Sequence, residues 1–149
     1  MLYETISNDM KEAMKNHDKD SLSTIRLLKS DIDLYLINNK MDRNEAIDDI
    51  VIDVVSKQVK KHKESIEEFK KGNRLDLVNN LEREIELLSK YLPKQLTKEE
   101  IEAEIDKVFD KVKPTSIKEI VLIMKELTPV LKGKADMKLV NELIREKLN

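Results

Sequence analysis

The sequence predicts an all-α protein, and three features of the chain favour this fold class. Apolar residues recur at three- and four-residue intervals through most of the 149 residues, which is the spacing of amphipathic helices. Three prolines and two glycines are too few for the turns of an extensive β-sheet. Both glycines, Gly72 and Gly133, lie at breaks between apolar-periodic segments. We therefore predict long helices joined by short turns.

Two helices are predicted before residue 40. The first places Leu2, Ile6 and Met10 on one stripe and ends in the polar run at residues 16–20. The second begins at a cap supplied by Asp20 or Ser21 and stops at the asparagines of positions 38 and 39.

Two further helices are predicted before residue 93. The third begins at the capping pair Asp42 and Glu45 and continues to Gly72 as one long helix. The fourth follows that glycine and closes before Pro93, because a proline disfavours helical geometry in the residue before it. We place a domain boundary here, which gives a helical amino-terminal domain at residues 1–92.

Three helices are predicted in a small carboxyl-terminal domain at residues 93–149. Thr97 and Glu100 form a capping pair for the first, which ends near residue 112. The second starts with a capping pair at positions 116 and 119 and is ended by Pro129. Asp136 caps the last helix.

Composition limits the function classes. The net charge of −2 excludes the overall positive field of a dedicated nucleic-acid-binding protein, so any anion site must be local. Residues 111–138 supply such a region, with seven lysines against three acidic residues. The lack of cysteine excludes disulfides, thiolate catalysis and the common zinc frameworks. With no secretory signal and no apolar run of roughly 20 residues, we predict a cytoplasmic protein without a membrane partner.

Neither a catalytic site nor a metal or cofactor site is predicted. The two histidines, His17 and His62, are too few and too far apart for a usual metal site. The serines lie outside any glycine-rich nucleophile turn, and no glycine-rich phosphate loop is present.

The best candidate site is a group of lysines around the Gly133 turn. A turn that meets a helix amino terminus offers backbone amides and a positive helix end, to which lysine ammonium groups would add charge for a phosphate. The alternative is that these lysines only aid solubility and that Asp136 occupies the amides as a cap. The candidate nucleic-acid-binding residues are Lys113, Lys118, Lys132, Gly133, Lys134 and Lys138.

Several motifs together resemble the small bacterial YqeY proteins. They are the run Gly72-Asn73-Arg74-Leu75-Asp76, then Glu84, then Tyr91-Leu92-Pro93. The run from Gly133 to Leu148 is similar to the tail domain of GatB, a subunit of the amidotransferase that amidates mischarged tRNA. The resemblance supports structural roles for Gly72, Arg74, Asp76, Glu84, Tyr91, Pro93 and Asp136. At the start of the fourth helix, we expect Asp76 to favour the positive helix end and Arg74 to pair with Glu84 or a carbonyl.

The chain departs from the family pattern at two places. Where the family usually has an acidic residue, a methionine and a glycine, this chain has Glu119, Ile120 and Val121, and valine forbids a close backbone approach. Lys134 replaces a common arginine, which keeps the charge but loses the bidentate fork.

The resemblance implies a non-catalytic helical accessory protein of tRNA-dependent amidation or tRNA charging. Such a protein would bind tRNA, or a tRNA-charging enzyme, through residues 93–149. One alternative is a protein-interaction adaptor with no RNA role, whose partner helix docks near Tyr91 and Leu96. A second is a component of a glutamine-dependent carbon–nitrogen ligase that contributes only to substrate delivery, since no catalytic site of such a ligase is visible.

Overall fold

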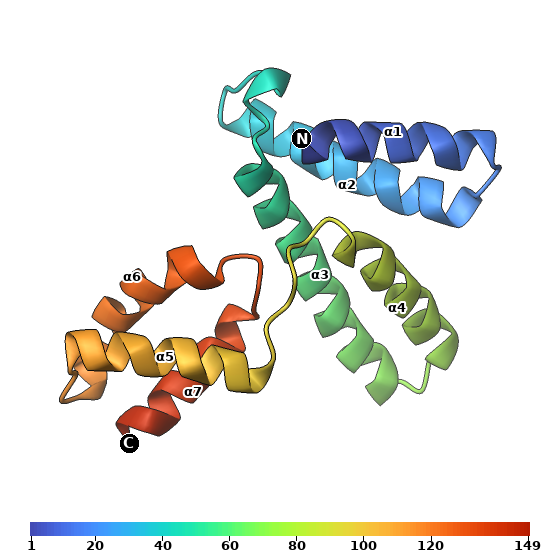
Figure 1. The fold of residues 1–149 in the computed structure, drawn as a ribbon. Coiled ribbons are helices and arrows are strands. Elements are labelled where there is room, and N and C mark those ends of the chain that lie inside the picture. Colours follow the sequence, from blue (N-terminus) through green and yellow to red (C-terminus); the bar gives the residue numbers. More distant parts are fainter. The chain divides into compact units, whose positions relative to one another are not determined.

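The computed structural model describes residues 1–149, and the chain forms two compact units, Met1–Leu92 and Pro93–Asn149. Seven α-helices and two short 3-10 turns make up the regular structure, with no strand (Figure 1). The predicted all-α fold class is therefore confirmed. Whether each unit folds independently as a domain stays a prediction.

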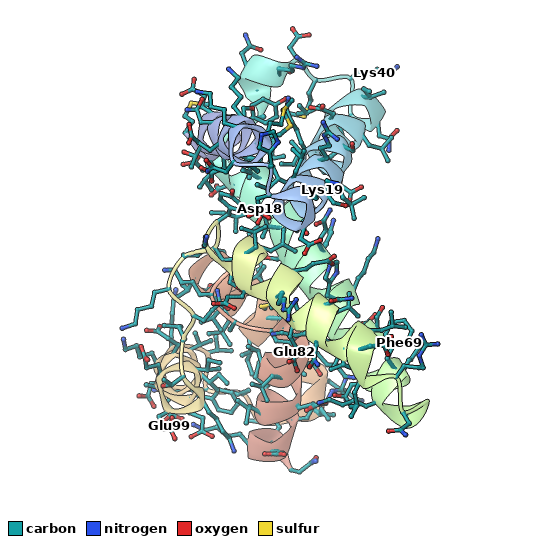
Figure 2. The ribbon with its side chains drawn as sticks, turned by 90° about the vertical axis from the view of Figure 1, so that its right-hand side faces the viewer. Asp18, Lys19, Lys40, Phe69, Glu82 and Glu99 are labelled. Carbon is teal, nitrogen blue, oxygen red and sulfur yellow. The ribbon has the colours of Figure 1, made fainter.

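The first unit contains α1 (Leu2–Lys15), α2 (Lys19–Asn38), α3 (Asp48–Lys71) and α4 (Leu75–Ser89). In Figure 1, α1 lies along α2, and α4 lies along the second half of α3. Figure 2 marks the two ends of α2 with Asp18 and Lys19 at the start and Lys40 just after the end. The core of this unit is aliphatic apart from one tyrosine and includes Ile6, Ile25, Leu28, Ile32, Leu36, Val51, Val55, Leu88 and Tyr91.

The first three helices all end in the same hydrogen-bonded turn. At the end of α3, the amide of Arg74 donates to the carbonyl of Phe69 at 2.9 Å, and the amide of Asn73 donates to that of Lys70 at 3.1 Å. This is the Schellman arrangement, in which one residue adopts a left-handed backbone. That residue is Asn73, with φ of 57°. Gly72, which marked this break in the sequence, has an ordinary φ of −85°.

The left-handed residues of the other two turns are also not glycines. His17 follows α1 with φ of 54°, and Lys40 follows α2 with φ of 55°. The bonds are equivalent, because Asp18 donates to Ala13 at 2.9 Å and Met41 donates to Leu36 at 2.8 Å. With Asn73 after α3 and Lys113 after α5 (Lys98–Val112), four helix ends therefore carry side chains in a conformation that suits glycine.

The caps of α2 and α3 differ from the prediction. Asp18 caps α2 by accepting the amide of Ser21 at 3.2 Å, so neither Asp20 nor Ser21 serves as the cap. Asp42 and Glu45 do form a capping box, but it surrounds the 3-10 turn Arg43–Glu45, and α3 starts later, at Asp48. From there α3 continues to Lys71 as one helix, as predicted.

The second unit contains α5 (Lys98–Val112), the 3-10 turn Ile117–Glu119, α6 (Ile120–Leu131) and α7 (Met137–Leu148). The predicted capping box at the start of α5 is confirmed, since Thr97 Oγ1 accepts the Glu100 amide at 3.2 Å and Glu100 Oε1 accepts the Thr97 amide at 3.3 Å. The three helices enclose a separate aliphatic core of Ile101, Ile105, Ile123, Leu127, Leu131, Val140, Leu143 and Ile144.

The prediction that Pro129 ends its helix is wrong, because α6 continues to Leu131. Proline lacks an amide donor, and its ring crowds the carbonyl four residues earlier, but the amides of the residues after it can still bond within the helix. Beyond it, the amide of Lys132 still donates to the carbonyl of Thr128 at 3.0 Å and closes the last turn. The Thr128 hydroxyl also donates to the Met124 carbonyl at 2.6 Å.

Candidate nucleic-acid interface

The structure places the six candidate residues at the two ends of α6. Lys113 follows the end of α5, and Lys118 lies in the 3-10 turn that leads into α6. Lys132, Gly133 and Lys134 follow α6, while Lys138 lies in the first turn of α7. The twelve residues of α6 span about 18 Å. The candidates therefore form two groups at opposite ends of a helix.

A further lysine, which is not among the six candidates, lies between these two groups. Lys125 is exposed near the middle of α6, seven residues from both Lys118 and Lys132. Lys118 and Lys132 flank α6, and because seven residues are almost two helical turns, we expect the three lysines on one side at intervals of about 10 Å. Ile123, Leu127 and Leu131 of the same helix are buried in the core. We call Lys118, Lys125 and Lys132 the lysine row, which the seven-residue spacing could have revealed.

All three carboxylates near the lysine row are engaged within the protein. Glu126 accepts Lys111 Nζ at 2.9 Å. Glu119 accepts the amide of Thr115 at 3.1 Å and its hydroxyl at 3.2 Å. Asp136 Oδ1 accepts the Lys138 amide at 3.0 Å. By contrast, the lysines of the row form no salt bridge, so their charges are available to an external anion.

The Gly133 turn holds its backbone groups more firmly than the sequence suggested. Gly133 has a left-handed φ of 74°, and its carbonyl accepts Gln95 Nε2 at 2.6 Å. The Lys134 carbonyl accepts the Leu96 amide at 2.9 Å, and the Lys134 amide donates to Leu131. Asp136 caps α7, as predicted, and uses the Lys138 amide. The turn therefore offers lysine ammonium groups, while the amides of Lys134 and Lys138 already have acceptors.

Two aliphatic side chains are exposed beside the lysine row. Val121 retains 71% of its accessible surface and Leu122 retains 52%. Val121 stands where the resembled family usually has glycine, so this surface is bulkier than the family pattern implies. The outer face of α6 is consequently both basic and partly apolar.

The other side of the second unit is acidic. A shallow cavity of about 340 Å³ between α5 and α7 is lined by Glu102, Ile105, Asp106, Leu143, Glu146 and Lys147. Lys147 pairs with Asp106, and its ammonium nitrogen lies 4.6 Å from the centre of the Phe109 ring. Three carboxylates against one lysine make this cavity unsuited to a phosphate.

The motif residues around Gly72 have structural contacts, one of which differs from the prediction. Arg74 pairs with Asp76, with Nε 3.4 Å from Oδ1, and not with Glu84. This contact holds the pKa of Asp76 below its usual value. Instead, Oε2 of Glu84 lies 2.6 Å from Nε2 of His62, which is a residue of α3.

Tyr91 and Pro93 lie on either side of the boundary between the units. Tyr91 is buried in the first core, and its hydroxyl donates to Asp9 of α1 at 2.5 Å. Burial, followed by the hydrogen bond and the charge of Asp9, raises the pKa of Tyr91. The Pro93 carbonyl accepts Gln95 Nε2 at 3.0 Å.

The structure brings together no group of three or more His, Asp or Glu side chains suited to a metal ion. None of the helices has both the length and the apolar character that crossing a membrane requires.

Comparison with known proteins gives a family match along almost the whole chain. Residues 3–148 match the family described as Yqey-like protein. A Schizosaccharomyces pombe protein described as uncharacterized is 35% identical over 92 residues, which cover 62% of this chain and 72% of that protein. The Lachancea thermotolerans protein named altered inheritance of mitochondria protein 41, mitochondrial, is 39% identical over 89 residues, which cover 58% of this chain and 46% of that protein. A Pyrenophora tritici-repentis protein of the same name is 33% identical, over 56% of this chain and 44% of that protein.

These relatives correct the predicted location. The cytoplasmic assignment is wrong, because four of the similar proteins are named as mitochondrial. The assignment rested on the lack of an apolar secretory signal, and that signal is not the one that directs proteins to mitochondria. The matches cover less than half the length of these four relatives.

Proposed function

The chain belongs to the Yqey-like protein family, and on this premise we propose that it is a non-catalytic accessory protein that binds the phosphate backbone of tRNA through residues 93–149. In this role it would assist a tRNA-charging or tRNA-amidating enzyme by holding the RNA. The observation that carries the proposal is the lysine row, whose three ammonium groups are unpaired while the neighbouring carboxylates all have partners.

The geometry favours contact with phosphates over recognition of bases. The row presents positive charges along about 20 Å, so it can contact several phosphates of one backbone. The second unit has one aromatic residue, Phe109, and Lys147 lies over its ring. Since stacking on aromatic side chains is the usual way to hold unpaired bases, we expect binding that depends on shape and charge.

Salt dependence is the direct test of this proposal. Fluorescence anisotropy with labelled total tRNA would measure affinity at about 50 and 200 mM salt, between which three phosphate contacts predict a roughly 20- to 40-fold loss. The triple variant Lys118→Glu, Lys125→Glu, Lys132→Glu should abolish binding at low salt. The matched control is the triple variant Lys15→Glu, Lys57→Glu, Lys70→Glu, which changes the net charge by the same amount at three exposed lysines of the first unit. Equal effects of the two triple variants, or no binding of the wild type at low salt, would refute the proposal.

The exposed aliphatic residues of α6 favour a second candidate function, that of a protein-interaction adaptor. Phosphates make no use of Val121 and Leu122, whereas a partner protein would bury them. The double variant Val121→Ser, Leu122→Ser separates the two functions. It should leave tRNA affinity unchanged if the lysine row binds RNA, and it should abolish a nuclease-resistant protein complex if α6 is an adaptor surface.

A further inference from the structure

The helix α2 has an apolar stripe on its exposed side in addition to the one in the core. Its buried stripe contains Ile25, Leu28, Ile32 and Leu36. On the other side, alternating intervals of four and three residues separate five uncharged residues, which we call the α2 seam: Ser23, Leu27, Ser30, Leu34 and Ile37. This spacing is the heptad pattern by which one helix packs along another.

The α2 seam has no partner within the first unit. Leu27, Leu34 and Ile37 retain 52%, 54% and 71% of their accessible surface, and both serines are exposed. Three large aliphatic side chains in heptad register on one solvent-facing stripe differ from the single exposed apolar residues that any protein surface contains. The seam extends over most of α2, between the ends that Lys19 and Lys40 mark in Figure 2.

We propose that the α2 seam binds the α2 seam of a second copy of this chain, in antiparallel orientation about a two-fold axis. Ser30 is the midpoint of the seam, with Ser23 and Ile37 seven residues to either side. A two-fold axis at this point places Ser30 beside its counterpart, and two small side chains at the crossing point let the helices approach closely. The leucines of each copy then pack on either side of that crossing, which gives a self-complementary interface.

The charges along the edge of the seam support the antiparallel pairing. Arg26 is exposed beside the seam, and Asp33 lies on the same edge seven residues later, partly exposed and with Oδ1 accepting the hydroxyl of Tyr3 at 2.9 Å. About an axis at Ser30, Arg26 of one copy lies within about one residue of Asp33 of the second copy, so opposite charges meet twice. On the other edge, Asp31 already accepts Gln58 Nε2 at 2.6 Å. In a parallel pairing each edge of the seam would face the opposite edge of the second copy, so Arg26 and Asp33 would lie on different sides of the interface and could not pair with each other.

The size of the seam predicts weak association. Three partly exposed aliphatic side chains and two serines bury less than the roughly 800 Å² per partner of a stable interface. We therefore expect a dissociation constant on the order of 10–100 µM.

Sedimentation equilibrium of the full chain over about 5–500 µM tests the association. Leu34→Glu should weaken dimerisation at least ~10-fold, since it places a charge in the seam. Leu75→Glu is the matched control, because Leu75 is 59% exposed on α4 and lies outside the seam. A wild type that stays monomeric at the highest concentration, or equal effects of the two variants, would overturn the proposal. Neither variant touches the lysine row, so the tRNA proposal is tested separately.

Disulfide trapping tests the orientation. The chain contains no cysteine, so single cysteines can be introduced without removing any. In the antiparallel pair, Ser30→Cys lies beside its counterpart, whereas Ser23→Cys lies about 20 Å from its own. We expect mild oxidation to give a covalent dimer of the first variant and none of the second. Equal cross-linking of both variants, or of neither, would contradict the antiparallel seam.

Discussion

The left-handed residues that follow α1 and α2 give a quantitative prediction about stability. His17 and Lys40 have φ of 54° and 55°. The left-handed conformation costs an L-residue roughly 1–2 kcal/mol, and replacing that residue by glycine removes this cost. Part of the benefit, about 0.5–1 kcal/mol, is lost because glycine is more flexible in the unfolded chain. We therefore expect His17→Gly and Lys40→Gly each to stabilise the first unit by about 0.5–1 kcal/mol.

The two gains should add. His17 and Lys40 lie beyond opposite ends of the twenty-residue helix α2, about 30 Å apart. Effects of sites at this distance are usually independent. The double variant should therefore gain about 1–2 kcal/mol, which corresponds to a rise of about 5–15 °C in the melting temperature of a unit of this size.

Tyrosine fluorescence in a urea titration measures this stability directly. Tyr3, Tyr35 and Tyr91 all belong to the first unit, and the chain has no tryptophan, so the signal reports on that unit alone. The control is the double alanine variant, because alanine retains the strain of the left-handed backbone. If the glycine variant were no more stable than the alanine variant, the two turns would not be strained and the reasoning would be refuted.

Three further predictions concern single residues. Gly133→Ala should reduce the free energy of unfolding by at least about 1 kcal/mol, because φ of Gly133 is 74°. Gly72→Ala should be neutral or stabilising by up to ~1 kcal/mol, because φ of Gly72 is −85° and the atoms nearest to an added Cβ lie at 3.8 Å. Thermal melts followed by circular dichroism would measure both effects. Tyr91→Phe should cost about 1–2 kcal/mol at neutral pH, because the Asp9 carboxylate loses its donor. Since the pKa of Tyr91 is raised in the folded state, the unfolded chain loses this proton first, and urea titrations above pH ~10 should show wild-type stability falling more steeply with pH than that of the variant. Asp136→Ala should cost about 1 kcal/mol through loss of the α7 cap, whereas Asp136→Asn should retain most of that stability in the same melts.

The helices and several of their caps could be predicted because they depend on neighbours in the sequence. The side chains of Thr97 and Glu100 each accept a hydrogen bond from the other residue's amide, within one turn of the chain. A threonine followed three residues later by a glutamate is the sequence signature of this capping box. The same signature at Asp42 and Glu45 surrounds a 3-10 turn, because the cap does not decide how far the helix after it continues. The prediction that α6 ends at Pro129 failed for a related reason, because the last turn of the helix is closed by the Lys132 amide and does not need an amide from Pro129.

The candidate site was predicted only in part, because its electrostatics depend on contacts between helices. Lysine spacing in α6 is legible in the sequence, and Lys125 could have been selected from it. The pairing that neutralises Glu126 could not be predicted from the sequence, because its partner Lys111 lies on another helix. The pairing of Glu84 with His62, which are 22 residues apart, was missed for the same reason.

The bonds from Gln95 and Leu96 to the Gly133 turn have a practical consequence for dividing the gene. A fragment that begins at Lys98 would contain three complete helices, but the carbonyls of Gly133 and Lys134 would lose their donors at 2.6 and 2.9 Å. The loop that carries Lys132 and Lys134 would then be free to open. A fragment containing the carboxyl-terminal unit should therefore begin no later than Pro93. The five non-helical residues 93–97 then remain, and they include the two that hydrogen-bond to the Gly133 turn.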